Sequence, residues 1–137
     1  MTGRPVPEPT VLSEPFWAAA RRGELVVPHC TACGLRFFTP EPACPGCMSR
    51  DWTYAPSAGR GTVYSVTAVH RAPGPGFDTP FTLAVIDLDD GATLLSHVDA
   101  GDAGDPGDDW IGQRVRVDFR ALTDEIALPY FVPESTH

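Results

Sequence analysis

The sequence predicts a mainly β chain, in which a short helix and a four-cysteine zinc ribbon precede a small five-stranded barrel. Two observations lead to this fold class. Two C-x-x-C pairs lie in the first third of the 137 residues, and five short β-branched, apolar or aromatic runs follow Gly59 with no helical pattern long enough for a βαβ unit. We therefore expect an arm and helix over 1–24, a ribbon over 25–58 and a barrel over 59–137.

The N-terminal part is predicted to be a proline-rich arm followed by a short helix. The arm, residues 1–12, has no periodicity, so we expect contacts with other segments to order it. Ser13 has the residue type of an N-cap, Glu14 and Pro15 suit a first helical turn, and Gly23 suits the end of a helix. Two to three turns are too few for a helix that is stable alone, so its large apolar side chains must be buried against something.

The four cysteines have the spacing of a metal site. Cys30 and Cys33 form one C-x-x-C turn, and Cys44 and Cys47 form the second. Two such turns facing each other supply four thiolates in a tetrahedron about 2.3 Å from a zinc ion, with no coordination position left for substrate. The sequence therefore predicts a structural zinc site of these four residues, and His29 beside them is not needed as a ligand.

Of two other interpretations of the cysteines, an iron site remains open and a redox-active pair is disfavoured. Iron held as in rubredoxin uses nearly the same spacing and would make the chain an electron carrier, so the sequence leaves zinc and iron open. A redox-active pair of thioredoxin type is disfavoured, because both pairs lie in turns rich in glycine or proline with no helix pattern after them.

Strand patterns surround and follow the cysteines. Leu25–His29 is expected to lead into the first cysteine turn, and 36–39 to lead out of it. Asp89-Asp90-Gly91 is expected to form a hairpin turn. The five barrel strands are expected at 62–70, 81–88, 92–98, 114–119 and 126–132. Five short strands favour a closed barrel of the OB-fold type.

Charge is unevenly distributed within the net charge of −8. Up to Arg71 seven arginines face five acids, whereas beyond it three arginines face thirteen acids. An anionic partner is therefore expected at the N-terminal half. No apolar run suits a signal peptide or a membrane span, and four cysteines kept as metal ligands suit a reducing compartment, so we expect a cytoplasmic protein.

Several stretches together resemble a known family. These are the helix, the ribbon with "CGLRFFTPEPACPGC", the stretch "GRGTVYSVTAVHR" and "ALPYF" near the end. From 15 to 133 the chain resembles the acyl-CoA-associated OB-fold proteins that carry a rubredoxin-like zinc ribbon. The resemblance implies that the four cysteines are zinc ligands. The acidic loop over 99–109 departs from the family's pattern.

The resemblance also implies a function. Members look like accessory subunits that partner thiolase-fold enzymes (thiolases, acyltransferases, a steroid side-chain retro-aldolase) or hot-dog-fold hydratases. We accordingly predict a non-catalytic subunit that binds such a partner and assists acyl-CoA binding in lipid or steroid degradation or secondary metabolism. A ribbon-and-barrel protein that binds nucleic acid is the alternative from another class, disfavoured because the acidic barrel half repels phosphate. Neither nucleic acid nor membrane is an expected partner.

The remaining residues give candidate contacts but no catalytic site. No nucleophile-elbow pattern surrounds Ser65 or Ser96, so a triad of either serine with Asp87 and with His70 or His97 is disfavoured. We therefore assign no catalytic residue. Large apolar side chains on a short helix, arginines able to meet CoA phosphates, and a Gly/Pro loop over 71–80 are the features of a partner or acyl-CoA surface. The candidate contacts are Phe16, Trp17, Arg21, Arg22, Arg36, Arg71 and Phe77.

Overall fold

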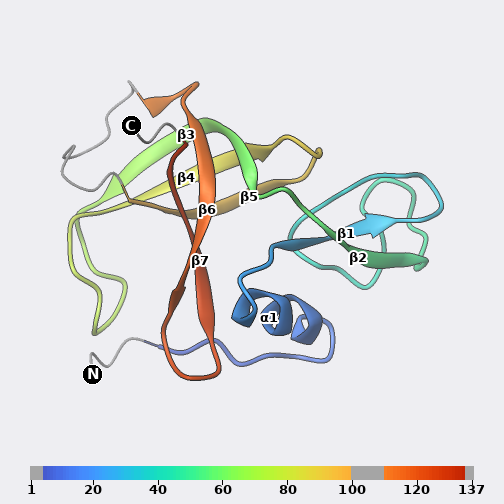
Figure 1. The fold of residues 1–137 in the computed structure, drawn as a ribbon, viewed down its shortest axis with the longest axis horizontal. Coiled ribbons are helices and arrows are strands. Elements are labelled where there is room, and N and C mark those ends of the chain that lie inside the picture. The colour runs from blue at the N-terminus through green and yellow to red at the C-terminus, as the bar shows by residue number, and fades with distance from the viewer. Residues whose placement is uncertain (1–4, 100–109, 135–137) are drawn as a thin grey trace.

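A helix and a two-stranded ribbon stand beside a closed barrel (Figure 1). The structure is a computed structural model, and it describes residues 5–99 and 110–134. No helix among these residues is long and apolar enough to cross a membrane. The elements are α1 (Glu14–Arg21), β1 (Val26–Cys30), β2 (Trp52–Pro56), β3 (Arg60–Val69), β4 (Phe81–Leu88), β5 (Thr93–Val98), β6 (Arg114–Ala121) and β7 (Ala127–Pro133).

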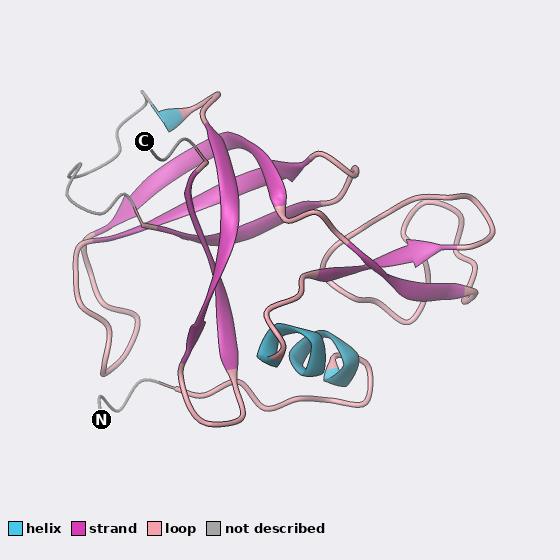
Figure 2. Ribbon diagram, in the orientation of Figure 1, coloured by secondary structure: helices cyan, strands magenta, loops and turns pink. Residues whose placement is uncertain are grey.

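The ribbon is an antiparallel pair of β1 and β2, separated by the two cysteine turns (Figure 2). Cys30 pairs with Trp52, and Val26 pairs with Pro56. No sequence pattern predicted β2, and the strand expected at 36–39 is reduced to one bridge between His29 and Arg36. The chain returns to β1 through β2 instead, because the second cysteine turn directs it back along the first strand.

The barrel confirms the predicted five-stranded fold. Its strand order is β3-β4-β5-β7-β6, and β6 pairs again with β3 to close it. The expected run over 81–88 coincides with β4, and Gly91 in the expected hairpin turn has the positive φ, 112°, that such a turn needs. Between β5 and β7 the barrel closes through a parallel pairing of two register positions, His97 with Tyr130 and Val98 with Phe131.

The barrel core is built by alternation along the strands. In β4 the residues Ala84, Ile86 and Leu88 are buried, and their neighbours point outward. Phe131 of β7 fills the middle of the barrel with none of its surface exposed. The outward residues Phe81, Leu83 and Val85 are also apolar, and only Asp87 is charged, which is why this stretch looks nearly continuously apolar in the sequence.

Helix α1 joins the ribbon to the barrel. Phe16 is 6% exposed and belongs to the cluster of buried side chains that contains Val27 of the ribbon and Phe131 of the barrel. The ring of Phe16 lies 5.3 Å from that of Phe38 of the ribbon. The helix ends at Arg21, and Gly23 then takes a positive φ of 79°, as expected.

Ser13 is the N-cap residue of the helix, as predicted, but it does not cap the helix through its side chain. Its Oγ instead accepts hydrogen bonds from the backbone N–H and the hydroxyl of Thr10, at 2.9 and 3.1 Å. The turn before the helix therefore uses the hydroxyl that the sequence assigned to the helix itself.

Polar contacts also link the ribbon to the barrel and to the N-terminal arm. Arg36 of the ribbon donates to the carbonyl of Pro56 at 3.0 Å, and its guanidinium lies 4.0 Å from Asp90 in the β4–β5 turn of the barrel. Tyr54 donates its hydroxyl to the carbonyl of Leu12 at 2.9 Å, which ties the arm to the ribbon. Of the acidic loop expected over 99–109, residues 100–109 lie outside the described residues.

Candidate metal centre and partner surface

The four cysteine sulfurs converge on one point at the end of the ribbon. All four Sγ atoms lie within 4.8 Å of one another. Cys30 and Cys47 are separated by 3.6 Å, and Cys33 and Cys44 by 3.7 Å. A regular tetrahedron with metal–sulfur bonds of about 2.3 Å has edges of about 3.8 Å, so these separations fit a four-thiolate metal site.

Backbone N–H groups and left-handed residues shape the two turns. Cys33 donates its N–H to the sulfur of Cys30 at 3.4 Å, and Gly46 donates to the sulfur of Cys44 at 3.3 Å. Gly34, directly after the first pair, has the expected positive φ, 84°. The equivalent position after the second pair is Met48, which takes a φ of 69° without being a glycine.

Without a cation between them, four thiols compete for negative charge. The backbone N–H of Cys33 lowers the pKa of Cys30 to about 7 against the opposing effect of burial. For Cys47 the N–H of Ser49 lowers the pKa, but contact with Cys33, burial and the other two sulfurs outweigh it and raise the pKa to about 12. Ionisation of Cys30 thus opposes ionisation of Cys47, and a central cation removes that repulsion.

Aromatic side chains cover one side of the cysteine cluster. Cys30 and Cys44 are fully buried and pack with Phe37 and the half-buried Trp52, whereas Cys33 and Cys47 are exposed. This cluster is a small apolar core for the whole ribbon end. Its order must therefore depend on the bonds to a metal ion.

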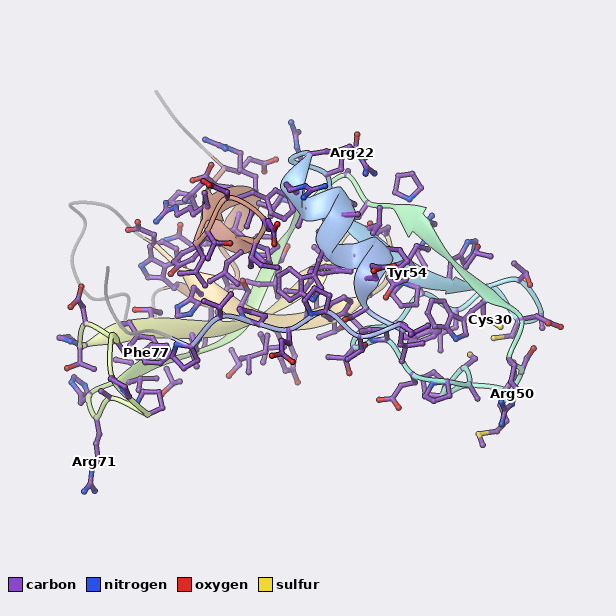
Figure 3. All side chains as sticks on the ribbon, turned by 90° about the horizontal axis from the view of Figure 1, so that it is seen from below. Arg22, Cys30, Arg50, Tyr54, Arg71 and Phe77 are labelled. Atoms are coloured by element: carbon purple, nitrogen blue, oxygen red, sulfur yellow. The ribbon has the colours of Figure 1, made fainter. Side chains whose placement is uncertain are left out.

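The seven candidate contacts do not form one surface. Phe16 is buried inside this chain, so internal packing already covers its ring. Arg36 is engaged between ribbon and barrel. Arg22 pairs with Glu24 at 3.3 Å, and in Figure 3 it lies well apart from Arg71 and Phe77 of the 70–80 loop.

Trp17 and Arg21 do share a groove. It lies between the arm, α1 and the β6–β7 turn and has a volume of about 960 Å³. Its lining residues are Val6, Pro7, Glu8, Pro9, Glu14, Pro15, Trp17, Ala18, Arg21, Thr123, Asp124, Glu125 and Ile126. Four carboxylates against one guanidinium make this groove acidic, so Arg21 is poorly placed to attract a phosphate.

The polar residues considered for a triad are engaged in structural hydrogen bonds. The hydroxyl of Ser96 donates to the carbonyl of Pro129 at 3.1 Å, and Asp87 accepts from the hydroxyl of Thr93 at 2.9 Å. Ser65 lies exposed on the outside of β3.

Comparison with known proteins identifies both parts of the chain. Residues 17–53 match the family model of the ChsH2 rubredoxin-like zinc ribbon domain, and residues 54–120 match that of the ChsH2 C-terminal OB-fold domain. A DUF35 domain-containing scaffold protein of Methanocaldococcus jannaschii is 30% identical over 105 residues, which are 74% of this chain and 71% of that protein.

A longer relative and a solved structure extend the match. The probable enoyl-CoA hydratase alpha subunit of Thermomonospora curvata is 37% identical over 86% of this chain, which spans only 36% of that subunit. The structure of the Ltp2-ChsH2(DUF35) aldolase contains a chain that superposes with a TM-score of 0.80 at 31% identity, covering 95% of this chain and 100% of that chain. The chain therefore belongs to the ChsH2-type DUF35 family, which joins a rubredoxin-like zinc ribbon to an OB-fold domain.

Proposed function

We propose that this chain is a non-catalytic accessory subunit, which binds an enzyme subunit of thiolase or hot-dog fold and supports its action on an acyl-CoA substrate. The observation that carries the proposal is the match over the full length of the DUF35 chain in the Ltp2-ChsH2(DUF35) aldolase. The match to part of a probable enoyl-CoA hydratase alpha subunit supports the same class of partner. The aldolase is named for Ltp2 as well as for ChsH2, and this chain spans only 36% of the hydratase subunit. In both relatives the region that matches this chain is therefore accompanied by further protein.

The geometry of the chain supports an accessory role in a second way. Four thiolates complete the coordination of a tetrahedral metal, so a metal at Cys30, Cys33, Cys44 and Cys47 has no site for substrate. Such a metal stabilises the fold of the ribbon. The buried hydroxyl of Ser96 is directed at carbonyl oxygens and so has no base to activate it.

Co-expression with candidate thiolase-fold and hydratase-fold subunits encoded beside this chain tests the proposal. We expect a stable complex with one of them and a rise of the partner's turnover of acyl-CoA when this chain is present. The isolated chain is expected to turn over no acyl-CoA thioester. Thiolysis, aldol cleavage or hydration by the isolated chain at rates typical of enzymes would contradict the proposal.

We propose zinc as the metal. The purified chain is expected to contain one equivalent of zinc and to be colourless, because Zn²⁺ has a filled d shell and suits a closed tetrahedral site of four thiolates. Elemental analysis together with the visible absorption spectrum measures this. One equivalent of iron with rubredoxin-like colour would instead favour an electron carrier.

For the docking of the partner we propose the groove beside α1. Trp17 is half-buried there and its ring packs edge-on against that of Phe16 at 5.1 Å, so an exposed apolar edge is held in place by the core. Tryptophan is among the commonest interface anchors. The carboxylates that line the groove favour a partner element with arginine or lysine next to its apolar contact.

Trp17→Ala is expected to weaken the complex by about 2 kcal/mol, because a central tryptophan anchor contributes at least that much. Calorimetric titration of the partner measures the loss. Val11→Ala is the matched control, because Val11 is 96% exposed near the same helix and does not line the groove. If Trp17→Ala binds with unchanged affinity while neutralising the aspartates of 99–109 abolishes binding, the docking face is the barrel end instead.

A further inference from the structure

A row of aromatic rings runs across the outside of the barrel. Phe77 of the 70–80 loop stacks on Phe81 of β4 with ring centroids 5.7 Å apart, and Phe81 lies 5.2 Å from His97 of β5. His97 stacks on Tyr130 of β7 at 4.7 Å and an interplanar angle of 13°. The guanidinium of Arg120 lies over Tyr130 at 4.7 Å, which ends the row. Strands far apart in sequence thus contribute to one face.

The same face carries aliphatic side chains that the barrel core does not use. Leu83 stands opposite His97 in the register of β4 and β5, and Leu95 stands opposite Val85. Leu95 is 66% exposed although it is a large apolar residue. Phe77 and His97 of the row and both leucines line a groove of about 360 Å³. Its lining residues are Pro5, Pro7, Phe77, Leu83, Leu95, Ser96, His97, Leu128 and Pro129.

The chain's own arm borders this groove. Pro5, Val6, Pro7, Glu8 and Pro9 alternate proline with another residue. Each proline fixes its own φ and restricts the residue before it to extended conformations, so the arm is extended before it meets the barrel. It therefore loses little conformational entropy when it lies on a surface.

The arm is held weakly where it meets the groove. Among the described residues, hydrogen bonds from this end of the chain begin at Thr10, and none is made by residues 5–9. Val6 is 43% exposed, and Pro7 is half-buried against the groove. Pro5 and Pro7 thus share the groove with aromatic and aliphatic side chains, an arrangement that resembles the recognition of polyproline II segments by aromatic-lined grooves.

We propose that this groove is a binding site for an extended, proline-rich segment, and that Pro5 and Pro7 of the chain's own arm lie along it in the isolated chain. A partner segment of the same chemistry competes with the arm for the groove. The proposal goes beyond the accessory role and does not depend on it, because its groove lies on the outer face of β4 and β5 rather than beside α1.

The charge of this face favours a proline-rich segment over single-stranded nucleic acid, although the bases of nucleic acid also stack on rows of aromatic rings. Such binding needs a positive track for the phosphates. Arg120, the cation at the end of the row, is paired with Asp99 at 2.6 Å and with Asp118 at 3.2 Å. A segment whose contacts are apolar fits this neutralised face better.

A labelled peptide with the sequence of residues 1–9 tests the site in trans. The host is the full chain with Pro5→Gly, Pro7→Gly and Pro9→Gly, which loosens the arm and leaves the barrel and ribbon unchanged. We expect saturable binding by fluorescence anisotropy. The unaltered chain is expected to bind the peptide at least about tenfold more weakly, because its tethered arm competes at an effective concentration in the millimolar range.

Matched variants locate the binding. In the same host Leu95→Ala is expected to weaken binding of the peptide at least about fivefold, whereas Tyr64→Ala is expected to leave the affinity unchanged. Both side chains are 66% exposed, but Tyr64 does not line the groove. A peptide with glycine in place of its three prolines is expected to bind at least about fivefold more weakly, because it is no longer extended in advance.

Three results would overturn the proposal. The first is no saturable binding in a host whose unfolding transition matches that of the unaltered chain. The second is equal binding by the proline and glycine peptides, or an equal loss in the Leu95 and Tyr64 variants. The third is evidence for another occupant. Tighter binding of a labelled oligothymidine than of the peptide would assign the face to nucleic acid, and a dimer that persists in the host with three glycine substitutions but binds no peptide would assign it to a second copy of the chain.

Discussion

Cys33→Ser is expected to release the metal and to unfold the ribbon while the barrel stays folded. Structural zinc in small modules contributes on the order of 10 kcal/mol to folding, and the end of the ribbon has little other core than Cys30, Cys44, Phe37 and Trp52. The buried side chains of the barrel belong to a separate cluster, which they share with Phe16 and Val27 but not with the cysteines, so we expect the barrel to stay folded without the metal. Elemental analysis measures the metal, and amide NMR signals report ribbon and barrel separately.

Arg50→Ala is the control for this experiment. Arg50 is exposed on the same end of the ribbon (Figure 3) and is not part of the cysteine cluster, so its loss should keep both the metal and the ribbon signals. A Cys33→Ser chain that retains a full equivalent of metal and an ordered ribbon would show that the four sulfurs do not act together. The soluble yield should fall in parallel with the ribbon signals, because unfolding exposes Phe37 and Trp52.

Phe16→Ala is expected to lower the free energy of unfolding by about 3–5 kcal/mol, the usual cost of removing a buried phenylalanine ring. The ring is 6% exposed, and it packs on Phe38 of the ribbon while belonging to the same cluster as Phe131 of the barrel. Its loss leaves a cavity where helix, ribbon and barrel meet. Urea unfolding followed by circular dichroism measures the change.

The neighbouring residue separates stability from recognition. Trp17 is half-buried, so Trp17→Ala should cost less stability than Phe16→Ala while costing more affinity for the partner. Val11→Ala, at a position 96% exposed, should shift the unfolding free energy by no more than about 0.5 kcal/mol. An unfolding midpoint of Phe16→Ala equal to that of Val11→Ala would mean that the helix does not join ribbon and barrel.

Local patterns were enough to predict the barrel and the cysteine turns. β4 coincides with its expected span because most of its residues are β-branched, aromatic or aliphatic and because Pro80 and the turn at Asp89 bound it. The glycine at position 34 allowed its positive φ to be predicted. The same conformation at Met48 could not be predicted from the residue type, since only its position after the second C-x-x-C pair indicates it. Family resemblance supplied the function, which no local pattern contains.

Contacts distant in sequence were the part that local patterns could not supply. β2 was missed because Trp52–Pro56 is short, ends in proline and becomes a strand only by pairing with β1. The arginines of the N-terminal half suggested a surface for an anionic partner, yet Arg36 meets Asp90 of the barrel and Arg21 lines a groove with Glu125. A charge count along the chain says nothing about which acid each cation meets after folding.

The parallel pairing that closes the barrel has a thermodynamic consequence. It contains only two register positions, and one of them, His97 with Tyr130, is also the closest stack in the aromatic row on the outer face. A molecule bound across that row touches both sides of the junction and binds the closed barrel better than an opened one. By mass action its binding energy then adds to the free energy that keeps β5 and β7 together, so occupancy of the face and integrity of the barrel are linked quantities.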